Sequence, residues 1–503
     1  MNYYLGLDLG TGSIKTVLFD ETGNAVCSSA CEYPLYQPFN GWSEQDPEDW
    51  VRAAVSTVRD CMEQSGVPAD AVRGLGISGQ MMGCVLLSEE GAVLRRAILW
   101  NDGRSTEACE HLKKIVPDDV FLEETLTPAR PGLTAAKIQW VRENEPEIFE
   151  KTRHILLPKD YLRWRLTGVY AAEVSDASAT QFLDIRNRRW SGKILQALDL
   201  REEMLGKVME SCDIAGPVLP GMAEAMGITS ACLAAGGASD NASAAVGTGV
   251  VVPGSAAITI GTSGTVVAFS GEPVPDLNRA VYNFCLPVRN AWHYMGSVNA
   301  CGGALKWWKS TAYPKDRDYA NIDREAASSS AGANRLLFLP YLNGEQSPHF
   351  DLRCRGAFVG LSSVHTRADM TRAVMEGATY ALRDILEAIQ KCGAGIKEIR
   401  LCGGGSRSPF WTQLVSDICH LPVYVPDMDS ENSAALGAAI LSMVGTGAYG
   451  SVPEACEAII KLKPEVWVPD PEKEAVYDRV YEEFDRLYPV LIGSSYRILG
   501  LEI

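Results

Sequence analysis

The chain has 503 residues, of which 46% are hydrophobic and 22% are charged. This is ordinary globular usage, which excludes extensive disorder and fibrous structure, and at roughly 100–200 residues per domain the length predicts two to four domains. The 63 acidic residues exceed the 46 Lys and Arg and give a net charge of −17. Without a basic stripe, such a surface repels polyphosphate backbones, so we expect no nucleic-acid partner.

Cysteine spacing and the amino terminus indicate a protein of the reducing cytoplasm. The 14 cysteines are scattered without a Cys-x-x-Cys pair, so neither a zinc ribbon nor a disulfide framework is predicted. The first residues lack the basic region of a signal peptide. Residues 241–271 carry no charge, but 15 of these 31 residues are Gly, Ser, Thr or Pro, which favours buried strands and turns over a membrane segment.

Turn residues and apolar alternation predict a β-meander at the amino terminus, with strands over 3–8, 15–20 and 25–29. Asp46-Pro47 begins a predicted helix with one apolar face. That face consists of Val51, Ala54, Val55 and Val58. Further strands are predicted at 74–78, 85–87, 155–157 and 399–402, and a long helix from about Ala368 to near Gly393. Alternating strands and helices indicate an α/β fold with mixed sheets.

Two Gly-rich turns divide the chain into similar halves. Gly10-Thr11-Gly12-Ser13 and Gly261-Thr262-Ser263-Gly264 both lie between apolar runs, half a chain apart. One pair of tetrapeptides is weak evidence of a repeat, but it suggests two related domains facing each other across a cleft. We place the boundary near 247–249. This gives an amino-terminal domain over 1–246 and a carboxy-terminal domain over 247–503, and leaves open that the last helices pack back on the first domain.

Both turns have the chemistry of a phosphate site. Asp8 ends a strand, and the small residues after it let backbone N–H groups and hydroxyls approach an anion, as polyphosphate with Mg²⁺ requires. An ordinary hairpin explains either turn alone, but two in one chain favour phosphate binding. Residues 403–409 place three glycines between a strand and a helix, which suits a phosphorylated ligand or, equally, a tight corner.

Asp240 lies where a small-residue segment meets a predicted helix over 242–246. Its local sequence is explained by an N-cap role. Alternatively, its carboxylate is a general base that accepts a hydroxyl proton during phosphoryl transfer. Both interpretations stay open from the residues alone.

Several patterns exclude other chemistries. The sequence G-x-G-x-x-G occurs at 74–79, but no helix is predicted after it, which argues against a dinucleotide fingerprint. No G-x-x-x-x-G-K-[ST] and no G-x-S-x-G occurs, so neither a P-loop nor an α/β-hydrolase is predicted. The six histidines form no metal-spaced cluster, and we expect each to be a surface or capping residue.

Longer motifs resemble the FGGY family of carbohydrate kinases over essentially the whole chain. They cover residues 132–144, 356–361 with 373–376, 42–47, 100–104, 157–162 and 338–345, and the last four are similar to members that phosphorylate xylulose. The resemblance implies two actin-like, ribonuclease-H-like domains with mixed sheets flanked by helices. It further implies a cleft that closes over ATP, Mg²⁺ and a sugar, and transfer of the γ-phosphoryl group to a primary hydroxyl of a ketopentose, with D-xylulose as the leading acceptor.

The resemblance also implies roles for single residues. Asp240 matches the catalytic base, and the sugar would lie against Met81, Met82, Asn101, Asp102, Asp240 and Asn241. Asp8 would assist the metal, and the nucleotide would lie among Thr11, Gly12, Ser13, Lys15, Gly261, Thr262, Gly303, Gly404, Gly405 and Ser406. We expect a small sugar as partner and no membrane, with a homodimer left open.

One segment departs from the family pattern. Xylulose-phosphorylating members usually have Gln-Met-His-Gly where this chain has Gln80-Met81-Met82-Gly83. A thioether in place of imidazole removes a hydrogen-bond donor and acceptor, so another ketopentose, a ketohexose or a polyol stays open as acceptor. The alternatives from other classes are a non-catalytic, actin-like sensor of ATP and sugar, and a nicotinamide oxidoreductase built on 74–79.

Overall fold

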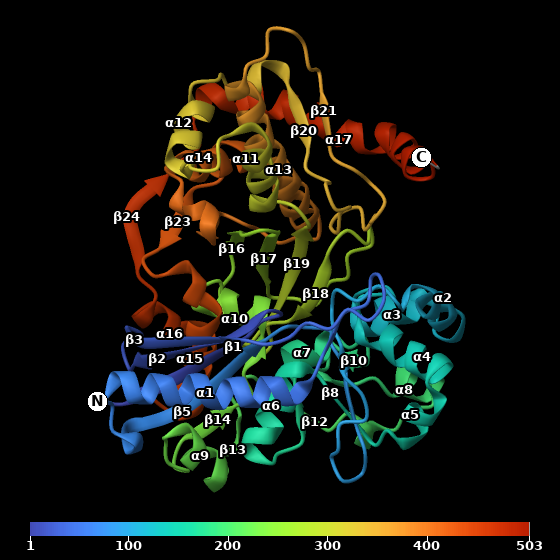
Figure 1. The fold of residues 1–503 in the computed structure, drawn as a ribbon, viewed down its shortest axis with the longest axis vertical. Helices are drawn as coiled ribbons and strands as arrows, with labels where there is room; N and C mark the ends of the chain where they lie inside the picture. Colours follow the sequence, from blue (N-terminus) through green and yellow to red (C-terminus); the bar gives the residue numbers. More distant parts are fainter. Residues whose placement is uncertain (502–503) are drawn as a thin grey trace.

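The computed structural model describes residues 1–501 and contains two seven-stranded mixed sheets (Figure 1). The first sheet has the order β13-β14-β5-β1-β2-β3, with β15 paired to β5. Its strands are β1 (Tyr3–Leu9), β2 (Ser13–Asp20), β3 (Ala25–Glu32), β5 (Val72–Gly79), β13 (Ile214–Pro217), β14 (Leu233–Ala235) and β15 (Ala238–Ser239).

The second sheet has the order β18-β19-β17-β16-β22-β23-β24. Its strands are β16 (Ser255–Ile260), β17 (Gly264–Ser270), β18 (Tyr282–Cys285), β19 (Trp292–Val298), β22 (Glu398–Cys402), β23 (Val423–Pro426) and β24 (Leu462–Trp467). In each sheet an antiparallel meander is followed by a parallel neighbour of its first strand: β5 lies beside β1, and β22 beside β16. The predicted likeness of the two halves is therefore present in the strand order.

Helices flank both sheets. Around the first lie α1 (Pro47–Ser65), α6 (Pro158–Thr167), α7 (Val174–Ser178), α9 (Pro220–Met226) and α10 (Asp240–Gly247). An additional helical region, on the right of the lower lobe in Figure 1, consists of α2 (Thr106–Ile115), α3 (Asp118–Thr125), α4 (Thr134–Asn144), α5 (Pro146–Lys151) and α8 (Gly192–Ala197). The later helices are α11 (Gly302–Ala312), α12 (Tyr319–Ala327), α13 (Arg367–Lys391), α14 (Pro409–Cys419), α15 (Ser433–Gly445), α16 (Val452–Ile459) and α17 (Pro471–Leu499).

Most predicted elements are present, with shifted ends. Asp46 caps α1 by accepting from the Glu48 N–H at 3.0 Å, and three of the four predicted face residues are buried while Val55 is half-buried. The predicted strands at 85–87 and 155–157 correspond to β6 (Val85–Leu87) and β8 (His154–Leu156), which pair with each other. The helix expected over 242–246 begins two residues earlier, at Asp240.

The expectation that every histidine is a surface or capping residue is wrong for His293. This residue lies in β19 and is completely buried. Neither ring nitrogen has a hydrogen-bond partner among residues 1–501. Burial lowers the pKa of His293 to about 4, so the imidazole is neutral at pH 7 and packs as an uncharged ring, 6.0 Å from Phe284 between centroids.

Helices α10 and α15 pack against each other between the two sheets (Figure 1). A Cβ atom on Gly247 would lie 1.9 Å from the carbonyl oxygen of Ser433, and one on Gly437 would lie 1.9 Å from that of Ser243. The two backbones therefore approach more closely than any side chain would allow. Although α15 comes between β23 and β24 of the second sheet in the chain, it lies against β1 and β5 of the first.

In the part of the chain that the structure describes, no helix is both long and apolar enough to cross a membrane.

Candidate active site

The turn between β1 and β2 is tight on one side and open on the other. The Gly10 N–H donates to the Ser13 carbonyl at 3.0 Å, which closes the turn. The indole N–H of Trp100 donates to Thr11 Oγ1 at 2.8 Å. No atom lies within 4 Å of the position that a Cβ of Gly12 would occupy, so a ligand can reach the backbone there.

Asp8 lies at the end of β1, directly before this turn. Its Oδ1 accepts from Ser78 Oγ at 3.0 Å, and Lys15 is its cross-strand partner. Burial raises the pKa of Asp8 above its ordinary value, although Ser78 and Lys15 act in the opposite direction. The ammonium group of Lys15 lies 4.0 Å from Glu431, in the segment before α15. A half-buried carboxyl group with one hydrogen-bond donor and one nearby cation is suited to a metal ion.

The turn between β16 and β17 repeats this geometry in the second sheet. The Gly261 N–H donates to the Ser263 carbonyl at 2.9 Å, and Thr262 is exposed. The first residues of α11 lie against the turn, since the Gly302 N–H donates to the Gly261 carbonyl at 2.8 Å and the Gly303 N–H to that of Thr262 at 2.9 Å. Thr262 and Gly303, far apart in sequence, are therefore neighbours.

The glycine corner at 403–406 lies beside the same turn. A Cβ atom on Gly405 would be 2.4 Å from Cγ2 of Ile260, the residue before Gly261. Ser406 uses its hydroxyl locally, donating to the Gly403 carbonyl at 2.8 Å. The structure thus gathers the predicted nucleotide residues of the second half at one end of β16 and β22: Gly261, Thr262, Gly303, Gly404, Gly405 and Ser406.

Asp240 is the first residue of α10, and Ser239 is the residue at the N-cap position. The backbone N–H and the Nδ2 of Asn241 donate to Asp240 Oδ1 at 2.6 and 2.8 Å. Burial, with a further contribution from the negative charge of Asp8, raises the pKa of Asp240 to about 7. A carboxyl group with this pKa can accept and release a proton at neutral pH. Its helix contacts both sheets, at β5 and β15 on one side and β17 on the other.

Met81 and Met82 follow β5 in a buried segment close to the start of α10. The Nδ2 of Asn241 lies 3.7 Å from Met81 Sδ. Met82 is buried and has a φ of 65°, a left-handed conformation that costs a side-chain-bearing residue about 1 kcal/mol or more. The Met82 carbonyl accepts from Thr134 Oγ1 at 3.2 Å.

The pair Asn101 and Asp102 is split by the structure. Asn101 is exposed, whereas Asp102 is buried. The Ser43 N–H donates to Asp102 Oδ2 at 2.6 Å, and the Arg104 guanidinium reaches both oxygens, at 2.6 and 2.8 Å. The Asp102 carboxylate is thus engaged within the protein.

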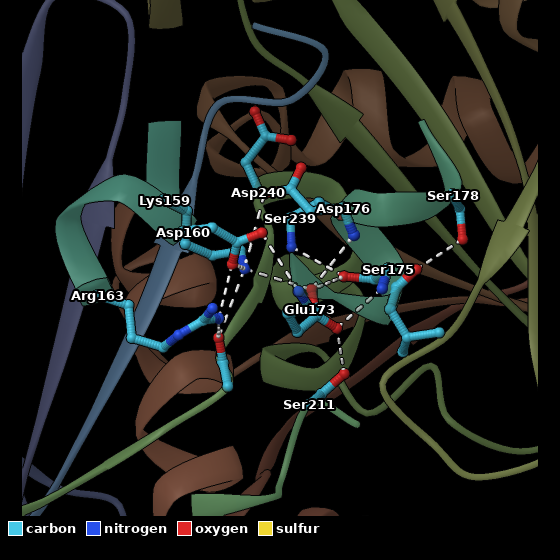
Figure 2. A network of polar contacts seen from close by, with 12 residues as sticks. Lys159, Asp160, Arg163, Glu173, Ser175, Asp176, Ser178, Ser211, Ser239 and Asp240 are labelled. Atoms are coloured by element: carbon cyan, nitrogen blue, oxygen red, sulfur yellow. Dashed lines mark hydrogen bonds and ion pairs between the residues drawn. The ribbon is translucent and has the colours of Figure 1, made fainter. Parts of the chain in front are cut away.

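Sequence reasoning missed a buried ionic network below Asp240 (Figure 2). Lys159 Nζ lies 2.7 Å from Asp160, 3.4 Å from Glu173 and 3.6 Å from Asp176, all completely buried. Arg163 Nη1 donates to Asp160 Oδ1 at 2.6 Å. The available signal was a cluster of charges inside the apolar motif at 157–162, which served only to carry the family resemblance.

Comparison with known proteins decides the family. The N-terminal domain of the FGGY family of carbohydrate kinases matches residues 3–247, and the C-terminal domain matches residues 256–446. The chain belongs to the FGGY family of carbohydrate kinases. Xylulose kinase of Bacillus subtilis (strain 168) is 34% identical over 97% of each chain. The resemblance inferred from the motifs is confirmed.

Solved structures agree with this assignment. A xyloylose kinase from Brucella ovis has a TM-score of 0.90 at 36% identity, covering 97% of this chain and 99% of its own. A gluconate kinase from Lactobacillus acidophilus has a TM-score of 0.93 at 26% identity, covering 99% of each. The expected pair of actin-like, ribonuclease-H-like domains with mixed sheets is confirmed.

The G-x-G-x-x-G at 74–79 lies in β5 with no helix directly after it, which removes the oxidoreductase interpretation.

Proposed function

We propose that this kinase transfers the γ-phosphoryl group of ATP to the primary hydroxyl of D-xylulose and forms D-xylulose 5-phosphate. The observation that carries the proposal is the Asp240 carboxyl group, whose pKa is raised to about 7 at the start of a helix that contacts both sheets. Full-length relatives that are xylulose kinases support the choice of acceptor. The gluconate kinase of the same fold keeps other polyhydroxylated acceptors as the second candidate.

In this proposal Asp240 is the general base. The acceptor O–H gives its proton to the Asp240 carboxylate as its oxygen attacks the γ-phosphorus, and ADP leaves with the electrons of the broken P–O bond. Because the transition state is loose, most of the catalysis is positioning and charge stabilisation. We assign the sugar to the side of Met81, Met82 and Asn241. Asn101 would approach it from the exposed rim, and Asp102 would act by holding that rim in place.

The nucleotide would lie in a cleft between a first lobe over 1–246 and a second over 247–503. Backbone and hydroxyl groups of the two Gly-rich turns would bind the phosphates, and the corner next to Ile260 would border the adenosine. The phosphate-binding residues would be Thr11, Gly12, Ser13, Lys15, Gly261 and Thr262. The residues beside the adenosine would be Gly303, Gly404, Gly405 and Ser406.

Asp8 fits a magnesium ion. Only Ser78 donates to its carboxyl group among residues 1–501, and burial disfavours its negative charge, so a cation would remove an existing electrostatic cost. Bound Mg²⁺ would neutralise charge on the phosphates. Asp8 would hold it, while Lys15 across the ladder would contribute a second positive charge to the same turn.

The test is ADP release from MgATP over a panel of D-xylulose, D-ribulose, ketohexoses, gluconate and glycerol. We expect D-xylulose to have the highest kcat/KM. Asp240→Asn should lower kcat by about 100-fold or more while ATP binding, measured by calorimetry, stays unchanged. ATP binding without ADP release for every acceptor would favour the sensor alternative instead, and a near-normal kcat in the variant would leave Asp240 a helix-terminal residue only.

A further inference from the structure

A buried hydrogen-bond chain leads to the residue before Asp240 (Figure 2). The Ser239 N–H donates to Ser175 Oγ at 3.0 Å, and that hydroxyl donates to Glu173 Oε2 at 2.7 Å. Glu173 Oε1 accepts from the Ser175 N–H at 2.9 Å, which also caps α7. Glu173, Ser175 and Ser239 are each completely buried. The hydroxyl of Ser175 therefore fixes the point at which α10 begins.

Ion pairs hold the end of this hydrogen-bond chain that lies farther from Asp240. Lys159 Nζ lies near Glu173 and Asp160, and it also donates to the Gly236 carbonyl at 3.4 Å. Burial raises the pKa of Asp176 well above its ordinary value, and neither of its oxygens accepts a hydrogen bond from residues 1–501. If Asp176 holds a proton, Glu173 and Asp160 balance the two cations, Lys159 and Arg163, and the network is neutral. In such a network the loss of any one charge leaves its partner buried and unpaired, which keeps the arrangement fixed.

The same network supports the segment opposite Asp240. Lys159 and Pro158 form the first turn of α6, which packs on both ends of the segment that carries Met81 and Met82. A Cβ atom added to Gly79 would lie 2.9 Å from Lys159 Cβ, and one added to Gly83 would lie 2.8 Å from Pro158 Cγ. The network thus contacts both the start of α10, which carries Asp240, and the segment that carries Met81 and Met82.

We propose that Ser175, held by Glu173, is a positioning residue for Asp240: it sets the start of α10 and thereby aims the carboxyl group at the acceptor hydroxyl. Figure 2 shows the Asp240 side chain pointing away from the network, while its backbone adjoins it. The network therefore leaves the carboxyl group free for substrate. This inference rests on the proposed function, since it takes Asp240 to be the base.

The test is a double-mutant cycle. Ser175→Ala removes the hydroxyl that accepts from Ser239, and we expect kcat to fall by about 100-fold, the scale of a misplacement of about 1 Å, with KM for ATP unchanged. Because Ser175 acts through Asp240, Ser175→Ala should cause no further loss in an Asp240→Asn background. The matched control is Ser416→Ala: Ser416 is an equally buried serine of α14, whose hydroxyl donates to the Leu421 carbonyl at 2.8 Å. Its loss should leave kcat unchanged.

A readout without substrate separates this inference from the proposed function. Hydrogen exchange of the Ser239 amide, followed by mass spectrometry of peptides over 236–247, should be faster in Ser175→Ala than in wild type and Ser416→Ala. If wild type releases no ADP with any acceptor, the proposed function fails and amide exchange alone decides the positioning role. The inference is overturned if amide exchange at Ser239 is unchanged in Ser175→Ala. It is also overturned if Ser175→Ala lowers kcat by the same factor in wild type and in the Asp240→Asn background.

Discussion

Replacing Asp240 by Asn should make the protein more stable at neutral and alkaline pH while it removes turnover. Burial, together with the charge of Asp8, raises the pKa of Asp240 from 3.8 to about 7. Between these two values the folded protein holds a proton that the unfolded chain has released. The stability of wild type therefore falls as the pH rises from about 4 to about 7. An Asn side chain does not titrate in this range, so the stability of the Asp240→Asn variant does not fall in this way.

The size of the effect follows from the two pKa values. The interval from 3.8 to about 7 corresponds to roughly 4 kcal/mol, at about 1.4 kcal/mol per pH unit. This is an upper limit, because Asp240 is partly exposed and because its replacement weakens the two hydrogen bonds from Asn241. We expect a gain of about 1–3 kcal/mol at pH 8 and almost none at pH 4.

The measurement is thermal unfolding of wild type and variant at a series of pH values between 4 and 8. Asp384→Asn is the matched control, because burial raises the pKa of Asp384, in the core of the other lobe, to about 8. It should give a similar pH-dependent gain while turnover stays intact. Wild-type kcat should rise with pH through about 7, since only the ionised Asp240 accepts a proton. A stability difference between Asp240→Asn and wild type that is the same at pH 4 and pH 8 would refute the reasoning.

Three further substitutions test separate parts of the structure. Gly437→Ala should destabilise the protein by about 3 kcal/mol or more, because its Cβ would meet a carbonyl oxygen of α10 at 1.9 Å; Gly192→Ala, with nothing within 4 Å, should leave the midpoint of thermal unfolding unchanged. Asp102→Asn should cost about 2 kcal/mol of stability, because the Arg104 guanidinium loses one of its two carboxylate partners while Glu44 stays 2.8 Å away. Unchanged stability with a raised sugar KM would make Asp102 a sugar ligand instead. Met82→His should change the ratio of kcat/KM between D-xylulose and gluconate by about 10-fold or more, and an unchanged ratio would exclude position 82 from acceptor choice.

Local patterns predicted the parts of the fold that depend on local physics. Alternation and turn residues located the β1–β2 and β16–β17 hairpins, whose Gly10 and Gly261 N–H groups close the turns in the same way. Helix signals located the start of α1 and both ends of α13 to within about two residues. The pairing of β1 with β5, or of β16 with β22, joins distant segments, and no local pattern specifies it. That arrangement was available only through the family resemblance.

His293 and the Lys159 network escaped prediction for a common reason. A titratable side chain on a helix or strand is normally found in water. The local signal at Lys159 and Asp160, charges inside an apolar motif, does not identify the distant partners, and His293 has no such signal. His293 is buried in β19 beside Phe284, where burial keeps its imidazole neutral. Lys159 is buried with the neighbouring Asp160 of α6, and Glu173 and Asp176, at the start of α7, lie close to its ammonium group.

The proton acceptor Asp240 and the buried network beneath it share one low-dielectric environment. The low dielectric that raises the pKa of Asp240 to about 7 also acts on every charge beneath it, and the negative charge of Asp240 contributes to the raised pKa of Asp176. A base matched to neutral pH therefore requires neighbours whose charges already cancel, because an unbalanced cation would stabilise the ionised form and lower the pKa of Asp240 again. Lys159 and Arg163 lie 2.6–3.4 Å from Asp160 and Glu173. With its cations paired in this way, the network can hold the start of α10 in place while burial and Asp8 set the pKa of Asp240 near 7.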